Sequence, residues 1–311
     1  MLAEESKPAG LTEVPATREF STKERVLGFV ALTKPRIIEL LLVTTVPTMV
    51  VAERGLPSLW LMVATVIGGT LSAGGANAIN MYVDRDIDRL MKRTQHRPLV
   101  VGVMSPRSAL VFAIAIEAVA FAWLWGFVNL LSAALALAAC LFYVCVYTLW
   151  LKRTSKSNIV IGGAAGAAPV IIGWSAVTNG LTWAPVVLFG VIFLWTPPHF
   201  WALAIKYRED YAAADVPMLP VVSSMRTTNR HIVAYTVMLW ASTLVFAPVA
   251  DMGLVFTAAA IILGAVFLWI ALDLARSPST GKAMRLFGFS ITYLVLLFAA
   301  MAADQLIRSG F

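Results

Sequence analysis

Charged residues are scarce in this sequence. Asp, Glu, Lys and Arg together make up 13% of its 311 residues, and hydrophobic residues make up 59%. Soluble domains carry about 25% charged residues, so this composition excludes a chain built from soluble domains. We therefore expect an integral membrane protein.

Cysteine is nearly absent as well. The two cysteines, Cys140 and Cys145, lie close together inside an apolar stretch. Two cysteines are too few for a disulfide framework or for a cysteine-based metal site. We expect both to contribute to packing only.

Nine apolar stretches dominate the chain, and each has about the 20 residues that cross a bilayer. They cover roughly residues 37–53, 58–80, 106–126, 130–150, 159–178, 183–205, 231–250, 254–274 and 284–304. We predict an all-α, polytopic membrane protein with nine transmembrane helices in a single domain, residues 27–311. Residues 1–26 are polar, contain Pro8 and Pro15, and lack the apolar core of a signal peptide. We expect them to form a disordered cytoplasmic tail.

The positive charges fall on one side of the predicted membrane. The net charge is +7, and all 24 Lys and Arg residues except Arg54 and Arg308 either precede the first stretch or follow an even-numbered one. Cytoplasmic loops carry the excess of Lys and Arg in membrane proteins. We therefore predict that the N-terminus lies in the cytoplasm and the C-terminus outside. The membrane that we expect is the bacterial cell membrane. The partner that this charge pattern indicates is the lipid bilayer, and no nucleic acid.

An acidic motif follows the second stretch directly. Asn80, Asp84 and Asp88 are spaced four residues apart, so a helix places them on one face and Asp86 on roughly the opposite face. Two neighbouring carboxylates repel each other unless a cation lies between them, and Mg²⁺ prefers a few carboxylates, water and phosphate as ligands. Alternatively, the motif is a solvated helix end with a salt bridge between Asp84 and Arg89.

Basic residues that could hold a phosphate lie in two places on the same predicted side. Arg93 and Arg97 follow the acidic motif, and Lys152 and Arg153 end the fourth stretch, shortly after Tyr147. A cation at the C-terminal end of a helix complements the helix dipole, which is a sufficient ordinary explanation for Lys152 or Arg153 alone. Several charged clusters on one membrane face, with carboxylates among them, usually mark a site.

A second polar cluster follows the sixth stretch. Pro197 and Pro198 are expected to break or kink that span. Lys206 and Asp210 are four residues apart and share a helix face. They form either a local salt bridge or a site in which Asp210 binds a metal ion and Lys206 meets a phosphate. Asp215 lies five residues further on, on a neighbouring face.

His199 is the only histidine inside apolar sequence. Trp195 precedes it, and Phe200 and Trp201 follow it. Such a histidine is either a hydrogen-bonded core residue or part of the wall of a flat hydrophobic pocket. The residues themselves leave both interpretations open.

Together these motifs resemble the UbiA superfamily of intramembrane prenyltransferases. The acidic motif, continued by Arg93 and Arg97, is similar to the first aspartate-rich motif of that superfamily. The segments that resemble its haem-farnesylating branch are Trp195-Thr196-Pro197-Pro198-His199-Phe200-Trp201, Asp210-Tyr211 and Val216-Pro217-Met218-Leu219-Pro220. Further similar segments are Thr33-Lys34-Pro35-Arg36, Tyr147-Thr148 with Leu151-Lys152-Arg153, and Gly162-Gly163 with Pro169.

The chain departs from the superfamily pattern in two places. Lys206 stands where the second acidic motif of the superfamily often has aspartate. The superfamily also has a tyrosine–lysine motif, Y-x-x-x-K, and here one additional residue separates Tyr147 from Lys152. These departures concern the second metal ligand and the lysine of the tyrosine–lysine motif.

The resemblance implies a bundle of nine helices around a central cavity, with two acidic motifs facing each other across its cytoplasmic mouth. It implies Mg²⁺ as the cofactor. The implied metal ligands are Asn80, Asp84, Asp88 and Asp210, the implied diphosphate-binding residues are Arg93, Arg97, Lys152, Arg153 and Lys206, and the implied catalytic residues are Asp84, Asp88 and Lys206. His199 and Trp195 are the residues that the resemblance places near haem.

The implied reaction is the transfer of a farnesyl group from farnesyl diphosphate to a vinyl group of haem B, followed by addition of water, on the route to the haem A cofactor of cytochrome oxidase. The implied partners are these two substrates, the bilayer, and the haem A synthase or oxidase assembly machinery. Two alternatives stay open. A related prenyltransferase acting on an aromatic quinone precursor would share the acidic motif but would not call for the proline–histidine segment. A membrane transporter would also place charges in broken helices.

Overall fold

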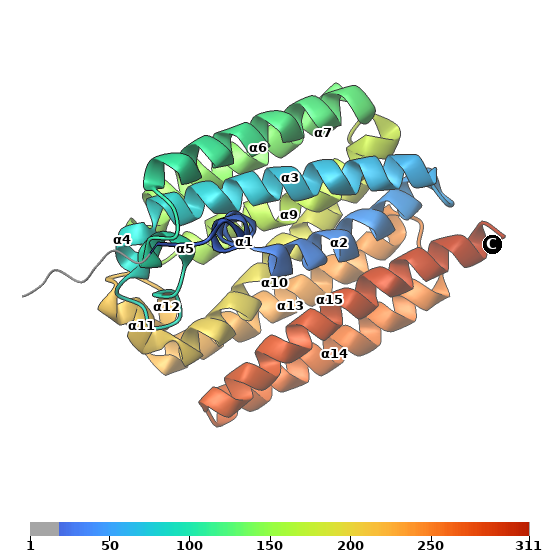
Figure 1. The fold of residues 1–311 in the computed structure, drawn as a ribbon. Coiled ribbons are helices and arrows are strands. Elements are labelled where there is room, and N and C mark those ends of the chain that lie inside the picture. The colour runs from blue at the N-terminus through green and yellow to red at the C-terminus, as the bar shows by residue number, and fades with distance from the viewer. Residues whose placement is uncertain (1–18, 311) are drawn as a thin grey trace, which may run out of the picture.

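The computed structural model describes the backbone of residues 19–310 and the side chains of that range except those of 36–42. Within these residues, the bundle consists of nine long helical segments (Figure 1). They are α2 (Pro35–Glu53), α3 (Leu59–Val83), α6 (Pro106–Phe127), the continuous run of α7 (Leu130–Leu141), η1 (Phe142–Leu151) and α8 (Lys152–Thr154), α9 (Asn158–Thr178), α10 (Trp183–Lys206), α13 (Met225–Val249), α14 (Leu254–Arg276) and α15 (Thr280–Arg308). The short helices are α1 (Thr22–Leu32), α4 (Arg85–Asp88), α5 (Pro98–Val101), α11 (Arg208–Ala213) and α12 (Leu219–Val222).

Each predicted apolar stretch coincides with one long segment, so the prediction of an all-α, polytopic membrane fold is confirmed. By length and composition, eight of the described helices could cross a membrane, one fewer than predicted. The difference is α2, of which only Val43–Glu53 counts as apolar helix because the side chains of 36–42 are not described. The backbone of α2 is helical over 19 residues, or about 28 Å, close to the roughly 30 Å of a hydrocarbon core.

Helix α1 begins before the predicted end of the N-terminal tail. The Ser21 side chain accepts the N–H of Glu24, and the Glu24 carboxylate accepts the N–H of Ser21 at 2.8 Å. This capping box satisfies two backbone donors and starts the helix at Thr22. The tail prediction is therefore wrong for residues 22–26, while residues 1–18 lie outside the described residues.

Helix α10 runs through Pro197 and Pro198 without interruption, so of the expected break or kink the break is not observed, and the kink stays a prediction. Each proline lacks the N–H that would bond to the carbonyl four residues earlier. Neighbouring helices compensate such a loss within a membrane, and α10 packs against α9, α13 and α15. Trp195 and His199 are consequently carried on one continuous helix with Lys206.

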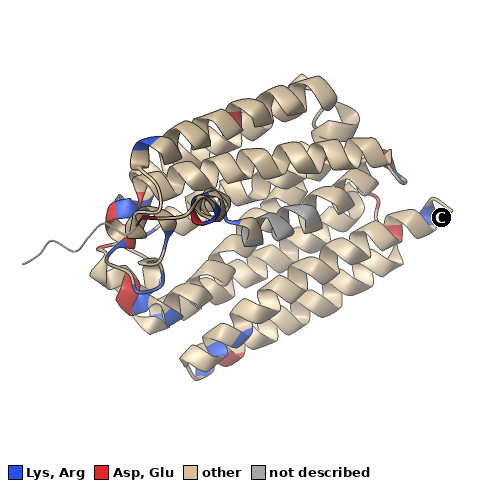
Figure 2. Ribbon diagram, viewed as in Figure 1, with Lys and Arg blue, Asp and Glu red and all other residues tan. Residues whose placement is uncertain are grey.

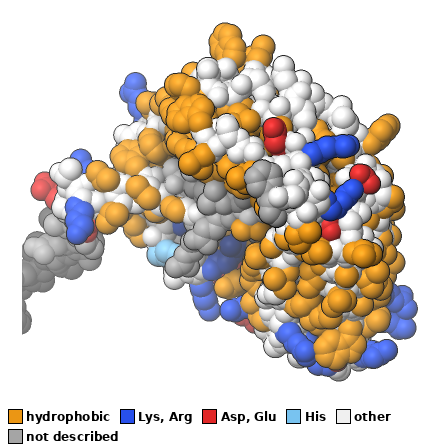
Figure 3. All heavy atoms as spheres, turned by 90° about the vertical axis from the view of Figure 1, so that its right-hand side faces the viewer, with side chains coloured by type: hydrophobic (Ala, Val, Ile, Leu, Met, Phe, Trp, Pro, Cys, Tyr) orange, Lys and Arg blue, Asp and Glu red, His pale blue; other side chains and the backbone are white. Residues whose placement is uncertain are grey.

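Charged side chains gather at the end of the bundle that carries α4, α5, α11 and α12, which we call the charged end (Figure 2). Helix α1 lies across the bundle near this end and is seen end-on in Figure 1. The opposite end faces the viewer in Figure 3, which shows many apolar side chains with some charged ones among them. The charged end, which we also call the mouth, is therefore the part of the described bundle that suits a charged ligand.

One buried carboxylate at the opposite end has a structural explanation. Asp304 of α15 is 2% exposed and accepts the backbone N–H groups of Gly253, Val255 and Phe256, the last two at 2.9 and 3.2 Å. These donors lie at the start of α14, where backbone N–H groups lack partners within the helix and the helix dipole favours a negative charge. Asp304 thus caps α14 from the neighbouring helix.

Candidate active site at the charged end

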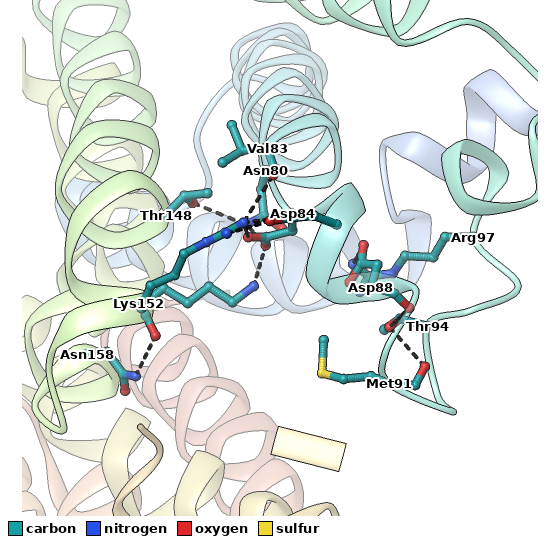
Figure 4. Close-up of polar contacts among 12 residues, drawn as sticks. Asn80, Val83, Asp84, Asp88, Met91, Thr94, Arg97, Thr148, Lys152 and Asn158 are labelled. Carbon is teal, nitrogen blue, oxygen red and sulfur yellow. Dashed lines mark hydrogen bonds and ion pairs between the residues drawn. The ribbon is translucent and has the colours of Figure 1, made fainter. Parts of the chain in front are cut away.

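The acidic motif lies where α3 passes into α4 (Figure 4). Helical hydrogen bonds continue across the junction, from the N–H of Asp84 to the carbonyl of Asn80 and from the N–H of Asp88 to the carbonyl of Asp84, both at 2.9 Å. Asn80 is 3% exposed, and Asp84 and Asp88 are 0% exposed. The side chain of Asp86 is 60% exposed, so the motif has the buried and outward faces that its spacing predicts.

Each buried carboxylate of the motif has one paired oxygen and one that accepts no hydrogen bond. Oδ2 of Asp84 accepts from the Lys152 ammonium and, at 2.7 Å, from the Asn80 amide. Oδ2 of Asp88 accepts from the Arg97 guanidinium at 2.6 Å. Oδ1 of Asp84 and Oδ1 of Asp88 are fully buried without a hydrogen-bond partner. Since buried polar atoms are nearly always bonded, these two oxygens point to a ligand.

The salt bridge considered between Asp84 and Arg89 is not observed, because Asp84 turns into the bundle toward Lys152 while Arg89 is exposed. Arg153 instead pairs with the outward Asp86, with both guanidinium contacts at 2.7 Å. These bonds from Arg153 hold the pKa of Asp86 at about 2, below its usual 3.8. Arg153 also approaches Asp84 Oδ1 to 3.7 Å, which is too long for a hydrogen bond.

A π-helix delivers Lys152 to the site. Segment η1 is a π-helix of 10 residues, and the N–H of Lys152 donates to the carbonyl of Tyr147, five residues earlier. π-helical turns are rare and frequent at functional sites. Such a turn brings residues five apart onto the same face, so it absorbs the additional residue between Tyr147 and Lys152. Tyr143 stacks on Tyr147 with ring centroids 5.4 Å apart, and Thr148 accepts a bond of 3.2 Å from Asn80.

Lys34 joins the site although the sequence analysis gave it no role. It precedes α2 in a left-handed conformation, with φ of 52°, and its ammonium donates to Oδ1 of Asn80 at 2.9 Å. Burial, together with the positive charges of Arg97 and Lys152, lowers the pKa of Lys34 to about 7. The only signal in the sequence was its place in the segment Thr33-Lys34-Pro35-Arg36 that resembles the family, and the side chain of Arg36 lies outside the described residues.

The second acidic segment meets the first through Arg93. The helix breaks at Tyr207, between α10 and α11. Oδ2 of Asp210 accepts the backbone N–H of Arg93 at 3.2 Å, and the Arg93 guanidinium lies 4.8 Å from the ring centroid of Tyr211. Nε of Arg93 is buried and unpaired. The loop between α4 and α5 and the start of α11 therefore form one wall of the mouth.

Lys206 does not share a salt bridge with Asp210 in the described structure. Its side chain is exposed, and its ammonium lies 5.4 Å from the ring centroid of Tyr207. The i,i+4 relation that would join Lys206 to Asp210 requires an unbroken helix. Asp215 is also exposed, with φ of +51°.

His199 and Trp195 lie deeper along α10. His199 is 9% exposed, and its ring stacks between Trp195 and Phe287, with centroid distances of 4.3 and 4.5 Å. Nδ1 of His199 lies 2.6 Å from Oγ of Ser290. His199 is therefore hydrogen-bonded and ring-stacked, as the interpretation of a core residue describes, and its place in the wall of a pocket stays a prediction.

The donor set at the mouth fits a magnesium ion that also binds phosphate. No group of three or more His, Cys, Asp or Glu suited to a metal ion occurs among the described residues. Mg²⁺ does not require such a group, because it is usually bound by one or two carboxylates plus water and substrate phosphates. The oxygens of Asp84 and Asp88 that accept no hydrogen bond, with the side-chain carbonyl of Asn80, supply that set.

The predicted residues thus fall into three places. Asn80, Asp84, Asp88, Arg97, Lys152 and Arg153 lie together at the mouth. Arg93 and Asp210 contact each other beside them, and Lys206 points outward. Trp195 and His199 lie further into the bundle. Four contacting residues were not predicted as site residues: Lys34 and Thr148, which bond to Asn80, and Phe287 and Ser290, which contact His199.

Comparison with known proteins places this chain in a family. The model of the UbiA prenyltransferase family matches residues 41–300. A protoheme IX farnesyltransferase of Streptomyces coelicolor is 54% identical over 318 residues, which cover 99% of this chain and 100% of that protein. A protein of the same name from Frankia casuarinae is 56% identical over 284 residues, which cover 90% of this chain and 98% of that protein.

Solved structures agree in fold. A structure described as digeranylgeranylglyceryl phosphate synthase has a TM-score of 0.76 at 15% identity, covering 91% of this chain and 99% of that one. A UbiA homologue from Archaeoglobus fulgidus bound to GPP and Mg²⁺ has a TM-score of 0.58 at 17% identity, covering 88% and 99%. The family match over most of the sequence and the identity to these relatives lead to one conclusion: the chain belongs to the UbiA prenyltransferase family.

Proposed function

We propose that this chain transfers a farnesyl group from farnesyl diphosphate to a vinyl group of haem B and, with addition of water, produces haem O. The observation that carries the proposal is the pair of buried oxygens of Asp84 and Asp88 that accept no hydrogen bond, beside the cations Lys152 and Arg97. This arrangement suits a metal diphosphate. The haem substrate is supported by relatives named protoheme IX farnesyltransferase at 54% and 55% identity.

The proposed cofactor is Mg²⁺, held by Asp84, Asp88 and Asn80, with Asp210 as a further ligand. The Asn80 carbonyl accepts from Lys34 and has a second lone pair for a metal ion. When bound, Mg²⁺ supplies positive charge that stabilises the departing diphosphate. The presence of GPP and Mg²⁺ in the Archaeoglobus fulgidus structure supports this assignment.

The proposed diphosphate clamp consists of Arg93, Arg97, Lys152, Arg153 and Lys206, to which we add Lys34. Guanidinium groups bind phosphate oxygens in pairs, whereas each ammonium acts as a compact charge. Fixed donors aimed at a developing anion lower the barrier more than mobile water does. Because Lys206 is exposed, we assign it to capture of the diphosphate rather than to the chemical step.

In the reaction, the bond between the first farnesyl carbon and its bridging oxygen breaks, and the electron pair leaves with the diphosphate. The allylic carbon then bonds to the terminal carbon of the haem vinyl group. Water adds to the cation that this leaves on the adjacent carbon and loses a proton, giving the hydroxyl group. The apolar interior excludes water from the first cation, and aromatic rings such as Tyr143 and Tyr147 can stabilise it.

We also propose that the charged end faces the cytoplasm, because Lys and Arg are concentrated there and are typical of cytoplasmic loops (Figure 2). The product would then be delivered within the bilayer to the haem A synthase or oxidase assembly machinery.

The proposed function is tested by mass spectrometry of haem extracted from bacterial membranes with and without this chain, in a host that lacks the activity. We expect a haem species carrying a hydroxyethylfarnesyl group only when the chain is present. A prenylated aromatic quinone precursor with unchanged haem would favour the related prenyltransferase instead. Transport of a substrate without any product of altered mass would contradict both.

A further inference from the structure

Ser290 of α15 contacts both haem-proximal residues of α10. Its carbonyl oxygen accepts the indole N–H of Trp195 at 2.8 Å. Its Oγ lies 2.6 Å from Nδ1 of His199 and also 2.6 Å from the carbonyl oxygen of Phe287. Ser290 is itself fully buried. One residue therefore fixes two side chains that lie 91 or more positions earlier in the chain.

The position of the hydroxyl proton follows from these contacts. A serine hydroxyl has one proton to donate, and a carbonyl oxygen can only accept. The contact of 2.6 Å between Oγ and the Phe287 carbonyl requires that proton, because two oxygens at that distance without a proton repel each other. Oγ must then accept from His199, so His199 carries its proton on Nδ1.

The opposite nitrogen of His199 is left with its lone pair. No described residue forms a hydrogen bond with Nε2, whereas Nδ1 is bonded to Ser290. The ring cannot turn easily, because it is stacked between Trp195 at 20° and Phe287 at 27°, with Phe200 against its edge at 84°. A ring that is held in this way presents one acceptor in one direction.

We propose that Ser290 is a positioning residue: it holds His199 in the tautomer protonated on Nδ1, so that the Nε2 lone pair is offered to the haem substrate as a ligand for its iron. This inference rests on the proposed function for the identity of the substrate. Histidine ligands of metals commonly donate their other N–H to a neighbouring oxygen, which fixes the tautomer and the ring orientation. Here the accepting oxygen is Oγ of Ser290, which lies on a different helix from His199.

The tautomer is measured directly by ¹⁵N NMR of the full chain in detergent, labelled at histidine. A background of His96→Gln and His231→Gln leaves a single histidine signal. We expect the Nδ1–H tautomer of His199 in this background and also with Ser290→Thr, which keeps the hydroxyl. With Ser290→Ala, we expect Nε2–H or a mixture of both tautomers.

Haem binding supplies the second measurement, by the absorbance spectrum of haem B titrated into the purified chain. Loss of such a supporting hydrogen bond typically weakens metal affinity about 10–100-fold. We therefore expect Ser290→Ala to lower the affinity for haem B by about this factor and to alter the absorbance spectrum toward weaker iron ligation. Affinity for farnesyl diphosphate should be unchanged, since its clamp lies at the charged end. Ser175→Ala, which removes another fully buried serine hydroxyl, is the matched control and should bind both substrates as the unsubstituted chain does.

The outcomes separate this inference from the proposed function. Nε2–H on His199 in an unsubstituted chain that binds haem would overturn the role of Ser290 alone. If Ser290→Ala lowered the affinities for haem B and for farnesyl diphosphate equally, this would indicate a folding defect and would also overturn the role of Ser290. An unsubstituted chain with Nδ1–H on His199 that binds no haem would contradict the proposed function, and the haem part of this inference with it.

Discussion

Replacing Asp84 with asparagine tests the proposed metal site and disturbs a buried ion pair at the same time. The Asp84 side chain is 0% exposed, and its Oδ2 accepts from Lys152 and Asn80. Asp84→Asn removes the negative charge and leaves the Lys152 ammonium buried without its partner, a change that typically costs about 3–5 kcal/mol. We therefore expect a lower melting temperature in detergent as well as a loss of turnover.

The double variant Asp84→Asn/Lys152→Met separates these two effects. Replacing both members of a buried ion pair is often neutral for stability, so the melting temperature should return toward that of the unsubstituted chain. Turnover of haem B and farnesyl diphosphate should stay at least about 100-fold lower, because the double variant lacks the proposed metal ligand Asp84 as well as Lys152 of the proposed clamp. Asp86→Asn is the control, since its exposed pair with Arg153 contributes roughly 1 kcal/mol or less. Turnover that recovers together with stability in the double variant would refute a role of Asp84 in the reaction.

Three further predictions concern orientation, capping and pH. In a background without Cys140 and Cys145, Ala212→Cys should be protected from a membrane-impermeant reagent in intact cells; labelling there would contradict a cytoplasmic charged end. Asp304→Ala should destabilise the chain by about 1.5–3 kcal/mol in thermal unfolding, because three backbone N–H groups lose a charged acceptor; an unchanged melting temperature would argue against the cap. The folded-state pKa of Asp86 is depressed to about 2, so its small stabilisation is complete above about pH 4 and is lost as the pH falls toward 2; an Asp86→Asn variant should lack this component, and identical unfolding profiles would exclude it.

The long helices could be predicted from sequence because membrane thickness and apolar length determine them. The stretch 183–205, for example, corresponds to α10 at Trp183–Lys206. Of the expected break or kink at Pro197 and Pro198, the break does not occur, and the kink stays a prediction. A sequence pattern shows the loss of two backbone donors but not the packing of α10 against α9, α13 and α15. The sequence shows that two backbone N–H donors are missing, but it does not show which neighbouring helices compensate for them.

The face of the acidic motif was also predictable, because helix periodicity alone places Asn80, Asp84 and Asp88 together. The partners of these residues were not. Asp84 pairs with Lys152, 68 positions away, rather than with the nearby Arg89. The pairing depends on a π-helix that changes the register before Lys152, and no spacing rule for an ordinary helix reveals such a turn.

The supporting contacts were hidden for a similar reason. Ser290 lies in a long apolar helix where serine has no distinctive neighbours, and it meets His199 across 91 positions of sequence. Lys34 meets Asn80 across 46 positions. For Lys206 and Asp210 the four-residue spacing left a salt bridge and a metal–phosphate site as alternatives, and the end of α10 at Tyr207 excludes only the salt bridge.

The most direct test of the central claim is turnover by the purified chain in detergent with haem B, farnesyl diphosphate and Mg²⁺ in water enriched in ¹⁸O. Mass spectrometry should find haem that has gained one farnesyl group and one hydroxyl group, with ¹⁸O in the hydroxyl and diphosphate released. Haem of unchanged mass under these conditions, while the chain still binds farnesyl diphosphate, would contradict the assignment of haem as the acceptor.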